Sequence, residues 1–231
     1  MKILSIDTSS KICGVAVLED EKLLKQISQN NGLTHSESLM PIIKNVLSDL
    51  NISLNEFDLI VCDKGPGSFT GIRIGVATTK AFSDSLNIKE IGISSLEALA
   101  YNIKTNGVIC SLIDAKNDNV YASVFENIDG NYILRRNFST ENINDLLKEF
   151  KDTDYSIAFV GDGAQIYKNI IESTLTNKCA FVEENDLSAY NLGLAGLNHF
   201  KNEDFSDVNP LYLRKPQAER MLELKMEIKN G

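Results

Sequence analysis

The sequence predicts an α/β protein in which one order of strands and helices, βββαβαβα, occurs twice. Short runs rich in Ile, Val and Leu alternate with amphipathic helical segments, and the pattern over residues 1–103 starts again at Gly107. The first strand of each half also ends in an aspartate, Asp7 and Asp114. This correspondence indicates an internal duplication, and the alternative is one α/β domain followed by an unrelated α+β domain.

The first half begins with three strand-like runs separated by polar turns. Apolar residues then recur three and four positions apart over residues 36–50, which predicts a helix with one apolar face. A continuous apolar run at 58–63 predicts a strand that is covered on both sides. The strands are expected at 3–7, 12–18, 23–27, 58–63 and 90–93, and the helices at 36–50, 72–86 and 95–103.

The second half repeats this order with weaker patterns. Strands are expected at 108–115, 120–127, 132–138, 156–164 and 179–182, and helices at 141–150, 165–175 and 187–200. Residues 222–229 alternate like a strand but consist of good helix formers, and we favour a helix there. The domain boundaries that follow are 1–104, 105–210 and a C-terminal segment 211–231, expected to be helical and to pack back on the first lobe.

Composition and charge exclude several classes of protein. Residues of the hydrophobic set make up 43% of the 231 residues and charged residues 24%, as in ordinary globular chains. The net charge of −9 repels nucleic-acid phosphates and anionic membranes, so we expect any contact with RNA to need another subunit. The chain has no long apolar stretch and its four cysteines lie far apart in apolar runs, so we expect a cytoplasmic protein with reduced thiols and no membrane contact.

The glycine-rich turn at 65–71 is the strongest local signal. Gly65 and Gly67 precede a predicted helix, and the free N–H groups of a helix N-terminus favour an anion such as a phosphate. The spacing matches neither GxGxxG nor GxxxxGK[ST], and Gly71 and Gly75 lie one turn apart, which suits close packing of another helix. Both interpretations stay open, and packing is favoured.

The sequence shows few groups of residues typical of a catalytic site. Asp7 and Asp114 could each assist a hydrated Mg²⁺ at a strand end, although capping of a turn is the simpler role. The two histidines, His35 and His199, have no partner at a metal-ligand spacing. Cys62 belongs to an apolar run with no histidine nearby, which argues against a nucleophile.

Several segments together resemble one family. ILSIDTSS at the N-terminus, GPGSFTGIRIG at 65–75, DAKNDNVYASVF at 114–125, VGDGA at 160–164 and NPLYLRKPQAER at 209–220 are similar to the TsaB (YeaZ) family of tRNA threonylcarbamoyladenosine biosynthesis proteins. The resemblance covers nearly the whole chain. It implies the actin-like, sugar-kinase and Hsp70-like fold, with two RNase-H-like lobes of βββαβαβα type.

The resemblance also implies a non-catalytic role. The related catalytic subunit TsaD carries a metal-binding His-Met-Glu-Gly-His segment where this chain has Ser95 and Leu99 at the two histidine positions. A hydroxyl and an aliphatic side chain do not replace two imidazoles as ligands of a transition metal. The family implies a scaffold that works with TsaD and the ATPase TsaE to form threonylcarbamoyladenosine next to the anticodon, in tRNAs that read codons beginning with adenine.

The helices at 36–50 and 71–86 are expected to bind the partner, and the same surface is expected to close a homodimer when the partner is absent. The expected interface residues are Leu39, Ile43, Val46, Gly71, Gly75, Val76, Thr79 and Phe82. The alternative is a nucleotide-dependent kinase or hydrolase with weak ATP or ADP binding at Asp7, Gly65, Gly67, Gly161 and Gly163. A peptidase activity is not supported, because the sequence shows neither a metal-binding pair nor a nucleophile triad.

Overall fold

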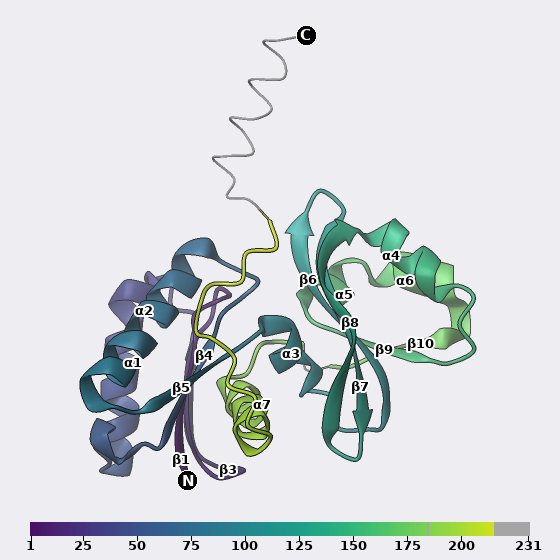
Figure 1. Cartoon of the computed structure of the whole chain (residues 1–231). Helices are drawn as coiled ribbons and strands as arrows, with labels where there is room; N and C mark the ends of the chain where they lie inside the picture. Colours follow the sequence, from purple (N-terminus) through teal and green to yellow (C-terminus); the bar gives the residue numbers. More distant parts are fainter. Residues whose placement is uncertain (184, 215–231) are drawn as a thin grey trace, which may run out of the picture.

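Two five-stranded sheets face each other across a pair of helices in the computed structural model, which describes residues 1–183 and 185–214 (Figure 1). The first half contains β1 (Lys2–Asp7), β2 (Cys13–Glu19), β3 (Lys22–Gln29), α1 (His35–Leu50), β4 (Leu59–Asp63), α2 (Phe69–Leu86), β5 (Lys89–Ile93) and α3 (Ser95–Ala100). The second contains β6 (Gly107–Lys116), β7 (Asn119–Ile128), β8 (Asn131–Asn142), α4 (Ile143–Phe150), β9 (Ile157–Val160), α5 (Asp162–Ile166), α6 (Lys168–Leu175), β10 (Cys179–Phe181) and α7 (Ala189–Lys201).

The two sheets have the same topology. Their strand orders are β3-β2-β1-β4-β5 and β8-β7-β6-β9-β10, so the third, second, first, fourth and fifth strands of each half follow one another. In each sheet the first three strands form an antiparallel meander, and the fourth and fifth are parallel to the first. The predicted duplication is confirmed, and most strands and helices fall within a few residues of their expected positions.

One expected helix is divided. The strand predicted over 156–164 ends at Val160, and α5 begins at Asp162. The helix predicted over 165–175 is divided between α5 and α6, which meet at Tyr167 with backbone angles φ −100° and ψ 14°. The ring of Tyr167 is buried, and its hydroxyl donates a hydrogen bond to Asp114 Oδ1 at 3.2 Å. No glycine or proline marks this break, so helical periodicity alone did not reveal it.

The elements form five layers, visible from left to right in Figure 1. Helices α1 and α2 cover the outer face of the first sheet, and α4, α5 and α6 cover the outer face of the second. Helices α3 and α7 lie between the sheets and contact each other. The core therefore consists of several apolar clusters, with the shared layer in the middle.

The two middle helices each pack on the sheet of the other half. Helix α7 follows the second set of strands but lies against β1, β2 and β5, and α3 follows the first set but lies against β6 and β7. The approach of α7 is close, because a Cβ atom added at Gly196 would stand 2.3 Å from Val61 Cγ2. The boundary at residue 104 separates the two repeats in sequence but does not separate them in packing.

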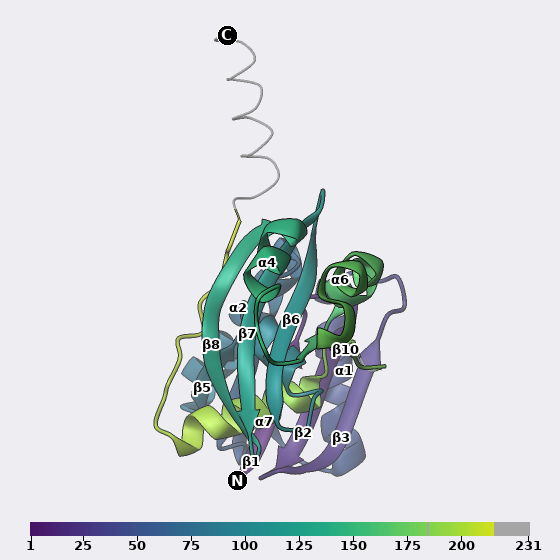
Figure 2. The same cartoon turned by 90° about the vertical axis from the view of Figure 1, so that its right-hand side faces the viewer.

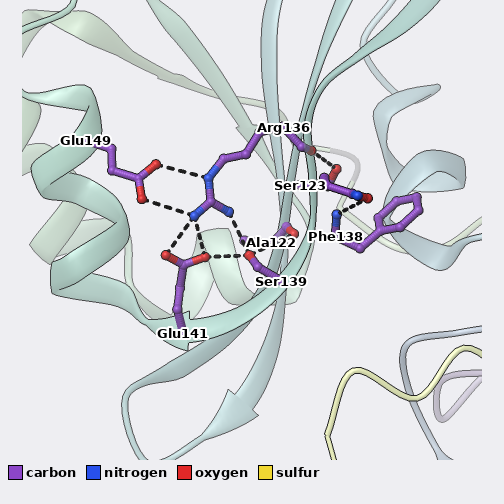
Figure 3. Close-up of polar contacts among 8 residues, drawn as sticks. Ala122, Ser123, Arg136, Phe138, Ser139, Glu141 and Glu149 are labelled. Carbon is purple, nitrogen blue, oxygen red and sulfur yellow. Dashed lines mark hydrogen bonds and ion pairs between the residues drawn. The ribbon is translucent and has the colours of Figure 1, made fainter.

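A partly buried charge network joins β8 to α4 (Figure 3). Arg136 lies within ion-pair distance of Glu149 on α4, at 3.0 Å, and of Glu141, at 2.8 Å. It also donates to Ser139 Oγ at 2.7 Å. Strand β8 is the edge of its sheet, beside β7 and β6 in the turned view of Figure 2. The network fixes this edge strand to the helix that follows it.

The chain leaves α7 and crosses from one lobe to the other. Gly92 N donates to Ser206 O at 3.0 Å and Leu211 N to Lys64 O at 2.7 Å, and Thr140 Oγ1 on the second lobe donates to Leu213 O at 3.1 Å. The predicted C-terminal helix lies, from residue 215 onward, outside the described residues. Within the described part of the chain, no helix has the length and apolar character needed to cross a membrane.

Candidate functional site

The site is built around Asp7, the last residue of β1. Its carboxyl group is buried, and Oδ1 accepts hydrogen bonds from Ser9 N and Ser9 Oγ, both at 2.8 Å. The second oxygen, Oδ2, has no hydrogen-bond partner among the described residues. The turn-capping role expected for an aspartate at this position is present.

A second carboxyl group, which the sequence analysis did not pair with the first, lies beside it. Asp63 ends β4, the parallel neighbour of β1, and is fully buried. Its Oδ2 lies 2.9 Å from Ser9 Oγ, and its Oδ1 accepts from Ser95 Oγ at 2.7 Å and Gly65 N at 2.6 Å. The signal in the sequence was that both predicted parallel strands end in aspartate.

Burial and proximity change the ionisation of this pair. Burial, followed by repulsion from Asp7, raises the pKa of Asp63 to about 8. Burial also raises the pKa of Asp7, although hydrogen bonds from Ser9 oppose the shift. Two carboxylates in one water-excluded site cannot both ionise cheaply, so the pair shares one proton at neutral pH.

The glycine turn after β4 packs against the loop that follows β1. A Cβ atom at Gly67 would stand 2.2 Å from Ser9 O, and one at Gly71 would stand 1.9 Å from Thr8 O. Ser68 N donates to Ser9 O at 2.7 Å, and Gly71 N to Ser68 Oγ at 3.2 Å. Several N–H groups that would cradle a phosphate are therefore already used, which supports the packing interpretation of these glycines.

The second lobe uses its glycines in a similar way. Gly161 has φ +104°, and a Cβ atom there would stand 2.1 Å from Leu112 O on β6. A Cβ atom at Gly163 would stand 3.0 Å from the same residue. The structure therefore brings Asp7, Gly65 and Gly67 together in one lobe and packs Gly161 and Gly163 on a strand of the other.

Asp114 corresponds to Asp7 in position but differs in chemistry. Its carboxylate pairs with Lys116 and accepts from Tyr167. Burial alone would raise the pKa of Asp114, but the contacts with Lys116 outweigh it and leave that pKa below its usual value. Asp114 is therefore an ionised, paired group, whereas Asp7 shares a proton with a neighbouring acid.

Helix α3 lies between the two glycine turns. Ser95 N donates to Gly65 O at 2.9 Å, and Ser95 Oγ donates to Asp63. One turn later, Leu99 Cδ1 lies 3.0 Å from the position that a Cβ atom would take at Gly161. The two positions where the resemblance places histidines in a catalytic relative are thus occupied by a hydrogen-bonding and a packing side chain.

The structure corrects the placement of the expected partner surface. Leu39, Ile43 and Val46 belong to the core under α1, and Gly71 and Gly75 face Thr8. Val76 and Thr79 are also buried, and Phe82 is half-buried against the same core. The apolar stripes of α1 and α2 face their own sheet, because burying that stripe is what holds each helix in place.

Comparisons with known proteins agree with this architecture. The model of the family described as TsaD, tRNA N6-adenosine threonylcarbamoyltransferase, matches residues 25–221. The tRNA threonylcarbamoyladenosine biosynthesis protein TsaB of Bacillus subtilis is 31% identical over 227 residues, which cover 95% of this chain and 96% of that protein.

Among solved structures, YeaZ from Pseudomonas aeruginosa superposes with a TM-score of 0.76 at 23% identity, covering 92% of this chain and 99% of that one. An activator of 2-hydroxyisocaproyl-CoA dehydratase from Clostridium difficile, solved with bound ADPNP, has a TM-score of 0.51 at 10% identity over 88% of this chain and 97% of that one. The fold class expected from the resemblance, α/β of the actin-like, sugar-kinase and Hsp70-like type, is confirmed.

Proposed function

Because this chain belongs to the TsaB family of tRNA threonylcarbamoyladenosine biosynthesis proteins, we propose that it is the non-catalytic scaffold subunit of that pathway. It works with a TsaD-like catalytic subunit and a TsaE-like ATPase to form the threonylcarbamoyl group. The modified base is the adenosine 3′ of the anticodon, at tRNA position 37, in tRNAs reading codons that begin with adenine. The tRNA is contacted only through the complex, which accords with the net charge of −9.

The observation that carries a non-catalytic role is the use of α3 as a packing element. Ser95 and Leu99 are both buried, and their contacts are with Asp63 and the turn at Gly161. A transition metal at this helix would lack its two imidazole ligands, which a hydroxyl and an aliphatic side chain do not replace. No group of three or more His, Cys, Asp or Glu side chains within the described ranges is arranged to hold a metal ion.

The outer face of α1 and α2 is the surface proposed for the TsaD-like partner. Met40 is 48% exposed on α1, and the exposed Ala77 and Ala81 lie one turn apart on α2. Small side chains at this spacing let another helix approach closely, and Met40 adds apolar contact area. The same face is proposed to close a homodimer when the catalytic partner is absent.

Reconstitution tests the proposed role. The chain is combined with the TsaD-like and TsaE-like proteins of the same organism, ATP, threonine, bicarbonate, the enzyme that makes the threonylcarbamoyl donor, and tRNA. We expect modified tRNA only when all subunits are present, and no turnover of ATP by this chain alone. Modification at an unchanged rate without this chain contradicts the scaffold role. ATP turnover that Asp7→Asn abolishes would instead identify an enzyme.

The partner face has its own test. Ala77→Glu places a charge where close packing is proposed, and we expect capture of the TsaD-like protein to fall by about tenfold or more. Ser173→Glu, an exposed position on α6 of the other lobe, is the control and should leave capture unchanged. If both variants are folded and capture the TsaD-like protein equally well, α2 is not part of the interface.

A further inference from the structure

A cavity of about 440 Å³ lies between the lobes, beside the carboxyl pair. Its first wall comes from the segment after β4, the end of β5, helices α3 and α7 and the chain that follows α7; its second wall comes from β7 and β8. Asp63 directs its carboxyl group to Ser9 and Ser95, whereas the next residue, Lys64, lines the cavity. This space, the Lys64 cavity, is therefore distinct from the site described above.

Lys64 makes no contact ion pair within the described part of the chain. Its stem crosses Gly92, where Cδ lies 3.0 Å from the position of an added Cβ atom, and its ammonium group donates to the hydroxyl of Ser206. Burial lowers the pKa of Lys64, although the charges of four nearby carboxylates, led by Glu97, oppose the shift. A half-buried cation with no carboxylate in contact gains when an anion reaches it.

The carboxylates of the same wall are already engaged. His199 Nε2 lies 2.7 Å from Glu97 Oε1, and its Nδ1 lies 3.0 Å from Asp204 Oδ2. Burial alone would lower the pKa of His199, but the two carboxylates outweigh it and raise that pKa. Both ring nitrogens of His199 thus lie beside acids, whereas the Lys64 ammonium group has three N–H donors and one hydrogen-bond partner, Ser206, among the described residues.

The opposite wall is apolar. Leu134 on β8 is 45% exposed, and Phe125, Tyr132 and Phe138 line the cavity beside it. Tyr132 is held in place because its ring stacks on Tyr101, with centroids 3.9 Å apart, and its hydroxyl donates to Ile103 O at 2.9 Å. The wall is thus formed before any ligand arrives, as in other small-molecule sites.

We propose that the Lys64 cavity binds a small monocarboxylate with an apolar or aromatic body. The carboxylate pairs with Lys64 Nζ, and the body lies on Leu134 and Phe138. One negative charge fits, because Glu97 and Asp204 in the same wall repel a polyanion such as a nucleoside triphosphate. An amine in the position of the carboxylate is disfavoured because the ammonium group of Lys64 repels it.

Three probes with one ring and different charges test this. Phenylacetate, phenylacetamide and phenethylamine are titrated into the full chain at low ionic strength, and binding is followed by chemical-shift changes in NMR. We expect phenylacetate to bind about tenfold more tightly than the amide, and the amine to bind weakest. No binding of phenylacetate up to about 20 mM, or equal binding of acid and amide, overturns the proposal.

Variants then locate the site. Lys64→Met keeps the stem but removes the charge, so it should remove the preference for the acid over the amide. Leu134→Ser should weaken both probes by a similar factor, because it removes only apolar contact. Lys22→Met, an exposed lysine on β3, is the matched control and should change neither. If Lys64→Met still prefers the acid over the amide, the assignment of Lys64 is wrong. If Lys64→Met fails to fold, Leu134→Ser still tests the cavity, because unchanged binding of both probes to that variant contradicts the proposed site.

Discussion

Asp7 and Asp63 end adjacent parallel strands, and the hydroxyl of Ser9 lies between their buried carboxyl groups, 2.8 Å from one and 2.9 Å from the other. Each carboxyl is within reach of the other's charge. One proton shared by the two carboxyl groups makes this arrangement stable, and it makes stability depend on pH.

Asp63→Asn should therefore stabilise the protein at pH 8. The folded chain holds the Asp63 proton up to about pH 8, because burial raises this pKa from 3.8. Between those pH values the unfolded chain has lost this proton and the folded chain keeps it, so the free energy of unfolding falls progressively as the pH rises. An amide keeps the oxygen that accepts from Ser95 and Gly65, and its N–H can donate to Ser9. We expect a gain on the order of 2 kcal/mol in urea unfolding at pH 8, and less at pH 5. Asp154→Asn, at an exposed position, is the control; a loss at both pH values would contradict a shared proton.

Gly71→Ala should destabilise the monomer, although alanine favours a helix. The added Cβ atom would stand 1.9 Å from Thr8 O, a backbone atom that cannot move without shifting the β1–β2 loop. Overpacking of this kind costs about 1–3 kcal/mol or more, which exceeds the gain of about 1 kcal/mol in helix propensity. Thermal unfolding measures the difference, and Ala81→Gly reports the propensity effect alone on the same helix. A higher melting temperature for Gly71→Ala would contradict this prediction, since it would show that the β1–β2 loop moves to accommodate the added Cβ atom.

Glu97→Gln should lower the pKa of His199. Burial lowers this pKa and Glu97 and Asp204 raise it above 6.5, so removal of one carboxylate leaves burial less opposed. A raised histidine pKa stabilises the fold fully below about pH 6.5, and this contribution is lost as the pH rises through the folded value. Glu97→Gln should therefore reduce the stability measured at pH 6 more than that at pH 9. Titration of the histidine ring signals by NMR reports the pKa directly, and His35 is the internal reference. An unchanged pKa of His199 in this variant would show that Glu97 does not influence the imidazole.

Arg136→Met should cost more stability than Arg135→Met, although the two residues are neighbours. The Arg136 side chain is 25% exposed and its partner Glu141 19%, so removing the cation leaves a partly buried carboxylate without its counterion, at a cost of about 1–3 kcal/mol. Arg135 is 50% exposed and pairs with Glu126 at the surface, where such a pair contributes about 0–1 kcal/mol. Urea unfolding of both variants gives the comparison. Similar values would mean that solvent screens the network in Figure 3.

The sequence predicted strands and helices well because their apolar patterns are local. It could not show which sheet a middle helix covers: α3 and α7 carry apolar residues suited to either sheet, and the choice depends on close approaches such as Gly196 to Val61. The expected partner residues on α1 were misplaced for a related reason. An apolar stripe does not reveal whether it faces its own sheet or another protein, and Leu39 and Ile43 face their own.

The candidate site was predicted in part. Asp7 was found because it ends a strand, and packing was favoured for the glycine turn. Asp63 was missed as a partner because the pairing depends on the neighbouring position of β1 and β4, which only the folded sheet shows. The Lys64 cavity could not be found at all, since its walls come from segments on either side of the interlobe space that are far apart in the sequence.

The exchange of α3 and α7 between the lobes has a consequence for synthesis. The inner face of the first sheet, with Ile3, Leu18 and Val61, stays uncovered until residues 189–201 have been made. The N-terminal lobe therefore cannot complete its core as an independent unit during translation. Its apolar strands stay exposed and prone to aggregation until the rest of the chain has been made. A truncated chain that ends before α7 would leave this surface open, so nascent fragments of this protein are natural clients for chaperones.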